Sequence, residues 1–439
     1  MLQSLNMLEV KTPDARWHRL GFRGYALLFA LLPWSVEIQM KGVALELPGE
    51  PLQVVLGLWL LFLLLRFRAW AWASVRENRF IQLGLVWIAW SIFTSFYSTM
   101  PLVSWKYTLV ETAHWGIFAL GMSLFPHWWR RLALVFTVSM SGFVIYTLFH
   151  HAGYHFRVDQ AILAPMPFFP EHTAYAAVVA LVLPWLVLGV FNNIPKRLRF
   201  SMLGLALTGL LFAFSRAAWL SVAGAGALGL IWYFRAYGRL FFAFSTVLLG
   251  LLWLNSAALS HFYAKKLSDD VSSQERINRY ACAARMYVER PWLGFGPGTF
   301  QFQYLPYQQP TEMTRISVQA PISGRNPDTY GRGGGAHSEY WQALTESGLP
   351  GLLLFLGLFW GLFGIGLLRL FRVKQDETTL VLLACLLSIL TFLLHGFVNN
   401  LLHDTRVAAL VWGQLGFIST ILSRIYPRLP HPFYKSHNF

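Results

Sequence analysis

The sequence predicts an all-α, polytopic membrane protein with about twelve transmembrane helices and one large helical loop. Of the 439 residues, 56% are hydrophobic and only 13% are charged, whereas about 25% are charged in a typical soluble chain. The mean hydropathy is +0.47. In addition, hydrophobic runs recur along the chain, many of them close to the roughly 20 residues that cross a bilayer.

Twelve of these runs are expected to span the membrane, with ends defined to within several residues. Runs shorter than about 20 residues require tilted helices or tight turns. Only Ser215 and Arg216 separate the seventh run from the eighth, so one long kinked helix is the alternative there. The expected spans are residues 20–37, 52–66, 81–99, 105–124, 132–149, 173–191, 200–214, 217–234, 240–257, 349–368, 379–398 and 405–423.

The positions of the cations predict the orientation. The net charge is +15, but the cations lie between hydrophobic runs instead of in one patch, so nucleic acid is not expected as a partner. Twelve spans place both termini on one side of the membrane. That side carries 21 Lys and Arg residues, and the short loops of the other side carry five. Because cytoplasmic loops are enriched in cations, both termini are expected in the cytoplasm.

The chain is therefore expected to have three parts: residues 1–257 with nine spans, an outward loop at 258–348, and residues 349–439 with three spans and a short tail. Within the loop, the spacing of apolar residues predicts a helix that ends at Pro291. The stretch LGFGPGTF that follows reads as a glycine-rich turn, and residues 302–335 read as loop. The helix face is formed by Ile277, Tyr280, Ala281, Ala284 and Tyr287.

His337 is the candidate general base. It follows the glycine run GRGGGA, which allows the backbone to approach a ligand closely. A helix from about Ser338 to Ser347 would place His337 near a helix N-terminus, where the positive end of the dipole disfavours the imidazolium. A neutral imidazole is what a base requires near pH 7. The alternative is a hydrogen-bonded histidine at the membrane interface.

Outward arginines are candidates for binding an anion. Arg216 sits between two hydrophobic runs, where a cation is costly unless it meets an anion or water; snorkelling to lipid headgroups is the alternative. Arg276 and Arg279 are three residues apart and can clamp a diphosphate, or can lie on a solvated face. Arg157 has only Asp159 close by. The cluster NNLLHDTR before the last span is expected to cap helices instead of reacting.

Other kinds of site lack support in the sequence. No His, Cys and Asp set has zinc-ligand spacing, and no Walker loop is present. The two cysteines, Cys282 and Cys385, lie in dissimilar surroundings, so no disulfide between them is expected. The chain thus offers an external base and external arginines, and neither a metal nor a cofactor is expected.

Three motifs resemble the O-antigen ligase and polymerase superfamily of bacterial inner-membrane glycosyltransferases. AHSEYWQALTESGLPG matches the family's histidine and its Glu-x-Gly-x-x-Gly, here Glu346, Gly348 and Gly351. RINRYACAARMYVERPWLGFGPGTF is similar to the family's arginine-containing helix and glycine turn, with its arginine best placed at Arg276. SRAAWL matches the third motif. Tyr280 stands where the family usually has tryptophan, and Pro170-Glu171-His172 replaces its Pro-Asn.

The resemblance implies a GT-C-like enzyme that moves a glycan from undecaprenyl diphosphate to an acceptor hydroxyl on the periplasmic side. His337 would take the proton of that hydroxyl in a single inverting displacement. Arginines would bind the diphosphate and offset the charge that develops as it departs, without a metal. The diphosphate-binding residues would be Arg216, Arg276, Arg279 and Arg157, with possible support from Glu339, His172 and Tyr280.

The expected acceptor is lipid A–core, which would make the protein a ligase that completes lipopolysaccharide in the bacterial inner membrane. The donor lipid, the acceptor and membrane lipids are then its partners. A polymerase that extends the glycan on its carrier is the alternative, and the short tail after the last span weighs against a protein-glycosylating type. A transporter of polyprenyl-linked glycan is the rival class, which Glu111 and His114 in the fourth span would support.

Overall fold

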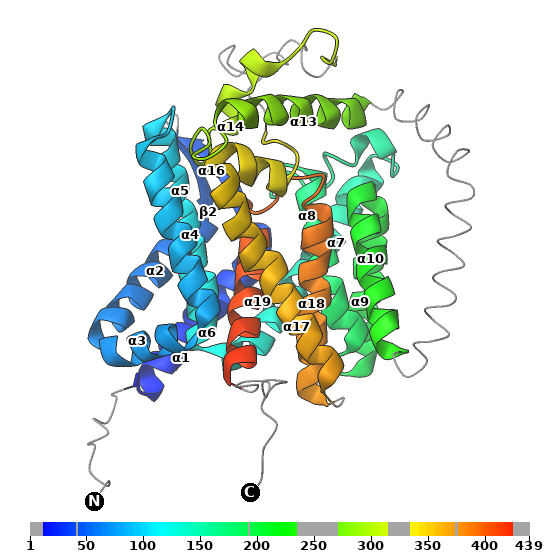
Figure 1. Cartoon of the computed structure of the whole chain (residues 1–439). Coiled ribbons are helices and arrows are strands. Elements are labelled where there is room, and N and C mark those ends of the chain that lie inside the picture. The colour runs from blue at the N-terminus through cyan, green and yellow to red at the C-terminus, as the bar shows by residue number, and fades with distance from the viewer. Residues whose placement is uncertain are drawn as a thin grey trace, which may run out of the picture.

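The structure, a computed structural model, describes residues 12–40, 43–191, 194–234, 271–314, 334–373 and 376–424. It is a bundle of α-helices with one short β-hairpin (Figure 1). Six of the described helices are long and apolar enough to cross a membrane: Gly49–Arg66, Arg79–Phe96, Pro126–Gly153, Glu339–Arg372, Glu377–His395 and Thr405–Ser423. The predicted class, an all-α polytopic membrane protein, is confirmed, whereas the number twelve stays a prediction.

Each predicted span that falls within the described residues overlaps a helix, and the span predicted at 240–257 lies outside them. The principal elements are α1 (Ala15–Leu31), β1 (Val36–Met40), β2 (Val43–Leu47), α2 (Gly49–Arg66), α3 (Arg68–Glu77), α4 (Arg79–Phe96), α5 (Pro101–His114), α6 (Gly121–Leu124), α7 (Trp129–Gly153), α8 (His172–Leu188), α9 (Lys196–Phe212), α10 (Arg216–Tyr233), α13 (Val271–Glu289), α14 (Phe300–Gln303), α16 (Glu339–Leu356), α17 (Leu362–Arg372), α18 (Glu377–His395) and α19 (Thr405–Arg424). Short 3-10 segments are η1 (Leu32–Trp34), η3 (Pro126–Trp128), η4 (Val158–Gln160) and η6 (Leu305–Tyr307), and π segments are η2 (Trp115–Leu120) and η8 (Gly357–Gly361).

The first span is shorter than predicted. Helix α1 ends at Leu31, and Pro33 lies in a 3-10 turn that leads into the hairpin. Strands β1 and β2 are antiparallel, with Val36 opposite Leu47. Proline interrupts the helical hydrogen-bond pattern and valine and isoleucine favour strands, so the apolar residues after Pro33 extend instead of continuing the helix.

Helices α9 and α10 are separate, which excludes the single kinked helix. Helix α9 ends at Phe212, and Phe214 has a φ of 49°, in the left-handed region. Ser215 caps α10, because its Oγ accepts a hydrogen bond from the Ala218 N–H at 3.4 Å. A serine cap satisfies one of the unpaired N–H groups at a helix start. Arg216 is consequently the first residue of α10.

Helices α18 and α19 form the interior of the bundle. Helix α18 packs against α8 and α10, and α19 packs against η2 and α6. Polar groups inside are paired across helices: Ser388 Oγ donates to Leu181 O at 2.6 Å, and Gln414 Nε2 donates to Ser388 Oγ at 2.9 Å. Inside a membrane protein such pairing is needed, because hydrocarbon supplies no partner for a polar group.

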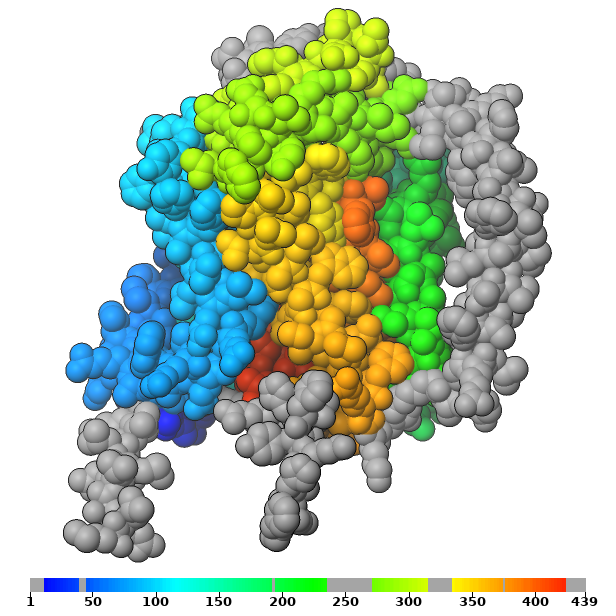
Figure 2. All heavy atoms as spheres, viewed as in Figure 1, coloured from blue at the N-terminus to red at the C-terminus, as the bar shows by residue number. Residues whose placement is uncertain are grey.

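Helix α13 lies across one end of the bundle, above α16 and α18 (Figure 1). In the space-filling view α13 and α14 cover the start of α16 (Figure 2). Helices α8, α10 and α16 begin at this end, and α18 finishes there, whereas α1 begins and α19 ends at the opposite end. The N-termini of α8, α10 and α16 therefore lie at the end beneath α13.

Candidate active site at the start of helix α16

The glycine segment before α16 turns the backbone sharply at His337. His337 has a φ of 52° and Gly334 a φ of 78°, and a positive φ is uncommon for a residue other than glycine. Ser338 returns to extended backbone, and α16 begins at Glu339. The Ser338 N–H donates to Asn400 Oδ1 at 3.2 Å, and the Glu339 N–H donates to Gly396 O at 2.9 Å. The loop between α18 and α19 thus fixes the residues on the C-terminal side of His337.

Glu339 supports the same loop with its side chain. Its Oε1 accepts hydrogen bonds from the N–H groups of Leu401 at 2.5 Å and Leu402 at 2.7 Å. A buried carboxylate that accepts two backbone N–H groups is well satisfied and rigid. Glu339 is therefore placed to position the neighbourhood of His337 instead of acting on a ligand.

The glycine turn after α13 packs backbone to backbone on α16. The Phe295 N–H donates to Thr345 O and the Gly296 N–H to Glu346 O, both at 2.9 Å. A Cβ on Gly294, which has a φ of 67°, would lie 2.4 Å from the Glu346 carbonyl carbon. Only glycine allows this approach and this conformation.

Glu346 occupies the N–H groups of that turn. Its carboxylate accepts from Gly298 N at 2.8 Å, from Phe300 N at 2.9 Å and from Gln342 Nε2 at 2.6 Å. The stretch LGFGPG resembles a phosphate-binding loop, but these two N–H groups bind an internal carboxylate. The turn therefore joins α13 to α16 instead of presenting those groups to a phosphate.

Arg279 is buried and bound on several sides. Its Nε donates to Glu275 Oε1 at 3.1 Å, and its Nη1 donates to Gly334 O at 3.0 Å and Gly335 O at 2.9 Å. The guanidinium also lies 4.8 Å from the centre of the Tyr304 ring. Arg279 thus ties α13 to the glycine segment that precedes His337.

Arg276, one turn earlier on α13, is half-buried. Its Nε donates to Val398 O at 3.0 Å, and its Nη1 donates to Ser272 Oγ at 3.1 Å. Its charge acts on His337, on His172 at the start of α8 and on His395 at the end of α18. Arg276 is therefore the arginine whose charge acts on all three of these histidines.

Tyr280 links α13 to both neighbouring segments. Its hydroxyl lies 3.1 Å from His337 O and 2.9 Å from Phe397 O, so one O–H group serves two carbonyl acceptors. The His337 backbone is thus held by α13 from one side and by the α18–α19 loop from the other.

The electrostatic surroundings keep the His337 ring neutral. Burial, followed by the charges of Arg279 and Arg276, lowers the pKa of His337 from 6.5 to about 3. Removing a charged form from water and placing cations beside it both disfavour the imidazolium. Burial is the largest cause of this shift in the structure, whereas the prediction relied on the helix dipole.

Residues 200–356, which run from α9 to the end of α16, match the family model described as O-antigen ligase. This part of the chain is thus similar to O-antigen ligase domains. The resemblance to the O-antigen ligase superfamily is thereby confirmed, and with it a glycosyltransferase-like enzyme of lipid-linked sugars in the broad sense. No curated protein matches the chain. The matched residues contain Arg216, Arg276, Arg279 and His337.

The other candidate residues, within the matched part of the chain and beside it, lie in different settings. Arg216 is exposed at the start of α10, which packs on α8 and α18, so it lies at the same end of the bundle as His337. His172 opens α8, and its Nδ1 is buried without a hydrogen-bond partner among the described residues. Arg157 precedes η4 and forms an exposed ion pair with Asp159 at 2.9 Å.

The cluster NNLLHDTR contains a buried ionic network at Arg406. Arg406 pairs with Glu46 at 2.5 Å and with Asp404 at 2.8 Å, and its Nη2 donates to Ser35 O at 2.9 Å and Phe168 O at 2.6 Å. Asp404 Oδ1 also accepts from the Arg406 N–H at 2.9 Å at the start of α19. These contacts join the hairpin, the loop before α8 and α19, which is a structural role as predicted.

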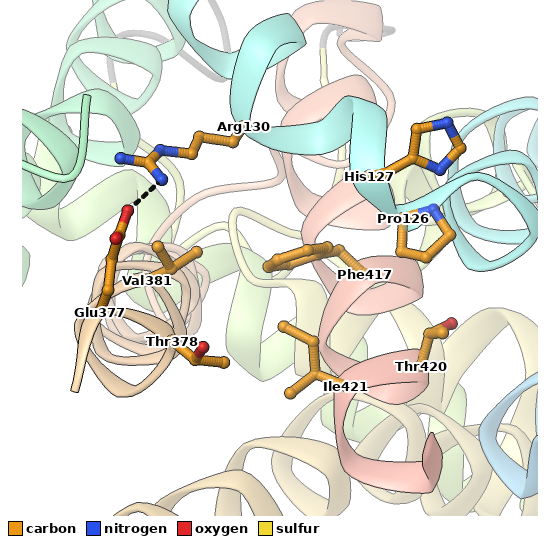
Figure 3. Close-up of a pocket in the computed structure, with 9 residues that line it drawn as sticks. All are labelled: Pro126, His127, Arg130, Glu377, Thr378, Val381, Phe417, Thr420 and Ile421. Carbon is orange, nitrogen blue, oxygen red and sulfur yellow. Dashed lines mark hydrogen bonds and ion pairs between the residues drawn. The ribbon is translucent and has the colours of Figure 1, made fainter. Parts of the chain in front are cut away.

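A cavity of about 420 Å³ lies at the opposite end of the bundle, between η3, α18 and α19 (Figure 3). Phe417, Val381 and Ile421 form its apolar part, and Arg130 reaches Glu377 across its rim at 2.5 Å. The cavity contains none of the predicted site residues, so its size does not make it the candidate active site.

Proposed function

We propose that the protein is an O-antigen ligase that transfers a glycan from undecaprenyl diphosphate to a sugar hydroxyl of lipid A–core. The reaction would take place at the periplasmic face of the bacterial inner membrane, with both termini in the cytoplasm. The observation that carries the proposal is the neutral, half-buried His337, held at the start of α16 near Arg276 within the part of the chain that matches the O-antigen ligase family model.

The proposed step is a single displacement at the anomeric carbon. The acceptor oxygen forms the new bond, the bond from the anomeric carbon to the diphosphate oxygen breaks, and the hydroxyl proton passes to the His337 imidazole. The diphosphate leaves as a stable anion, and the configuration at the carbon inverts. His337 is the proposed catalytic residue.

The end of the bundle beneath α13 suits the departing anion. The N-termini of α8, α10 and α16 lie there, and each carries the partial positive charge of its helix dipole. Arg276 and Arg216 would each place a full positive charge beside the diphosphate. Arg157 would place a further positive charge at the periphery of the site. Arg279 was expected to bind the diphosphate as well, but its contacts with Glu275 and Gly334 favour a positioning role.

The bound donor would also strengthen the base. Arg276 and Arg279 are among the causes that lower the pKa of His337. A diphosphate beside Arg276 offsets that charge and adds its own negative charge, and both changes favour the imidazolium. The imidazole therefore gains proton affinity when the leaving group is in place, which couples donor binding to base strength.

The loop 258–348 would carry the catalytic residues at the membrane surface, between the spans of residues 1–257 and those of 349–439. A site there lies at the level where two lipid carriers present their sugars, so both substrates can remain in the bilayer during transfer. Tyr280 and Glu339 would hold the His337 backbone and the neighbouring loop in place for both.

The test is complementation of a bacterial strain that lacks its own ligase but makes lipid-linked O-antigen and lipid A–core. The wild-type chain is expected to restore the ladder of O-antigen on lipopolysaccharide, and His337→Ala and Arg276→Ala to abolish it at equal membrane levels. His155→Ala is the matched control, since His155 also has a φ of 52° and is exposed in the loop after α7.

A ladder from His337→Ala at the wild-type level would overturn the base assignment, and it is also the outcome expected of a transporter. If the wild-type chain forms no ladder but lengthens the glycan in a polymerase-deficient strain, the protein is a polymerase and the ligase proposal fails. A loss of the ladder in His155→Ala would show that the assay reports folding instead of chemistry.

A further inference from the structure

Beside the arginine and histidine site lies a second set of polar side chains that lack partners. His395, 1% exposed at the end of α18, has no hydrogen-bond partner on either ring nitrogen among the described residues. Nδ2 of Asn399, which is 4% exposed, and Nδ1 of His172 also have no hydrogen-bond partner within the part of the chain that the structure describes. Nearly all buried polar groups in proteins are paired, so such a set requires an explanation.

The end of α18 that carries His395 adjoins the proposed catalytic residue. The Glu339 N–H donates to Gly396 O at 2.9 Å, and the Tyr280 hydroxyl bridges the carbonyls of His337 and Phe397. Residues 337–339 and 395–397 therefore run side by side. The Arg276 charge acts on His172 and His395 as well as on His337.

The chemistry of the second set differs from that of the arginines. Imidazole and carboxamide groups are uncharged, and each offers both a donor and an acceptor. This is the combination that hydroxyl groups match, whereas planar guanidinium groups match phosphate oxygens. An apolar side chain would fill the same space without the penalty of unpaired polar atoms.

We propose that His395, Asn399 and His172 form a subsite that binds the hydroxyl groups of a sugar ring next to the diphosphate; this inference rests on the proposed function. Arg276, which is assigned to the diphosphate, is the neighbour shared by both histidines. The first sugar of the donor, joined directly to the diphosphate, is therefore the occupant that the placement favours. The terminal sugar of the acceptor is the other source of the same chemistry.

The subsite is covered by α13 in this structure. Arg276 holds α13 against the α18–α19 loop through Val398 O, and the donor diphosphate competes for the same guanidinium. Donor binding at Arg276 would thereby release one contact that closes α13 over the unpaired side chains, which gives the sugar a way to reach them.

The test uses the purified full-length chain in detergent and three lipids: undecaprenyl diphosphate, undecaprenyl diphosphate carrying one N-acetylglucosamine, and lipid A–core. Affinities are measured by native mass spectrometry for the wild type, His395→Leu and His395→Asn. We expect the wild type to bind the sugar-bearing lipid at least tenfold more tightly than the bare lipid. His395→Leu loses that preference while binding the bare lipid normally, and His395→Asn retains part of it because the amide still donates and accepts.

Thermal unfolding separates a ligand-binding role from a structural one. His395→Leu removes two unpaired nitrogens from the interior, so its melting temperature is expected to equal or exceed that of the wild type. His151→Leu is the matched control: His151 is also 1% exposed, but its Nε2 lies 3.0 Å from Arg157 O. That substitution is expected to lower the melting temperature and to leave the preference for the sugar-bearing lipid intact.

The outcomes are distinct. If His395→Leu keeps the full preference for the sugar-bearing lipid and for lipid A–core, the subsite is overturned while the proposed function stands. If its affinity falls only for lipid A–core, the subsite is supported and belongs to the acceptor. If the wild type binds neither undecaprenyl lipid, the proposed function itself fails.

Discussion

Two arginines three residues apart on α13 have different surroundings. Arg279 is 5% exposed and pairs with the similarly buried Glu275, whereas Arg276 is half-buried and donates hydrogen bonds to Val398 O and Ser272 Oγ. Removing one partner of a buried ion pair leaves an uncompensated charge, which costs about 3–5 kcal/mol. The proposed division of roles follows: Arg279 supports the fold, and Arg276 binds the ligand.

Substitution of each arginine separates these roles. Arg279→Ala is expected to destabilise the protein by about 3–5 kcal/mol and to lower its level in the membrane, because Glu275 is left unpaired. Arg276→Ala is expected to have a free energy of unfolding within about 1 kcal/mol of the wild-type value but to form no O-antigen ladder. Thermal unfolding in detergent and the lipopolysaccharide ladder measure the two effects. Equal melting temperatures for Arg279→Ala and the wild type would contradict the structural role assigned to Arg279.

The pKa of His337 predicts a dependence of stability on pH. The folded state takes up the proton only near pH 3, whereas an unfolded histidine does so at about 6.5. Between these values the unfolded state binds more protons, so stability falls as the pH decreases from 6.5. At pH 5 the loss from this group is about 2 kcal/mol.

His337→Phe removes this contribution, so its stability is expected to fall less steeply than that of the wild type between pH 7 and pH 5. The measurement is chemical unfolding in detergent across that range. His155→Ala serves as the control and is expected to follow the wild-type slope. Parallel slopes for His337→Phe and the wild type would mean that the imidazole is open to water in the free protein.

At the residue scale the sequence predicts a role for His337 but not the different surroundings of the two arginines near it. The glycine run and the predicted helix start were enough to single out His337. Spacing places Arg276 and Arg279 on one side of a helix but does not show which of them is buried, because Glu275, Gly334 and Tyr304 surround Arg279 only in the folded chain. The unpaired nitrogens of His395 leave no pattern in the sequence at all.

At the scale of elements, the break in α16 at Gly348 separates the first turns of the helix from the part predicted to span the membrane. Gly348 has φ 67° and ψ −174°, outside the helical region, and the Leu349 N–H donates to Pro291 O at 2.8 Å. This break falls where the sequence predicted the loop to end and the span to begin. A Cβ at Gly348 would lie 2.1 Å from Trp292 O.

Gly348→Ala is accordingly expected to destabilise the protein by at least about 2 kcal/mol, since the left-handed conformation is strained and the carbonyl of Trp292 must move. Gly364→Ala is the control in α17, where a Cβ meets nothing within 4 Å, and it is expected to leave the melting temperature equal or higher. The measurement is the melting temperature of both variants in detergent. A wild-type melting temperature for Gly348→Ala would mean that the backbone at Trp292 moves at little energetic cost.

Helices were predicted well because twenty apolar residues in lipid have few alternatives to a helix. The hairpin and the short α3 were missed, since neither is hydrophobic enough to register as a span. The end of α1 was placed too late for a related reason: Val36 and Ile38 continue the apolar run, and hydropathy alone does not distinguish a strand from a helix.

At the scale of the whole molecule, the two ends of the bundle differ in character. Helix α13 and the candidate site cover one end, and α1 begins and α19 ends at the other. The distribution of Lys and Arg predicts that the second end faces the cytoplasm. The catalytic scheme depends on that orientation, because a ligase must meet lipid A–core and its donor on the outer side of the membrane.

Labelling of single cysteines tests the orientation directly. The native Cys282 and Cys385 are both fully buried, so a membrane-impermeant maleimide is expected to leave the wild-type protein unmodified in spheroplasts. Val158, 64% exposed, lies in the loop before α8, and the exposed Arg372 ends α17 at the opposite end. Val158→Cys should label in intact spheroplasts, and Arg372→Cys only after lysis, because the bilayer separates them. The reverse pattern would place His337 in the cytoplasm, where lipid A–core on the periplasmic face is out of reach, and the ligase mechanism would have to be abandoned even if every contact around His337 is correct.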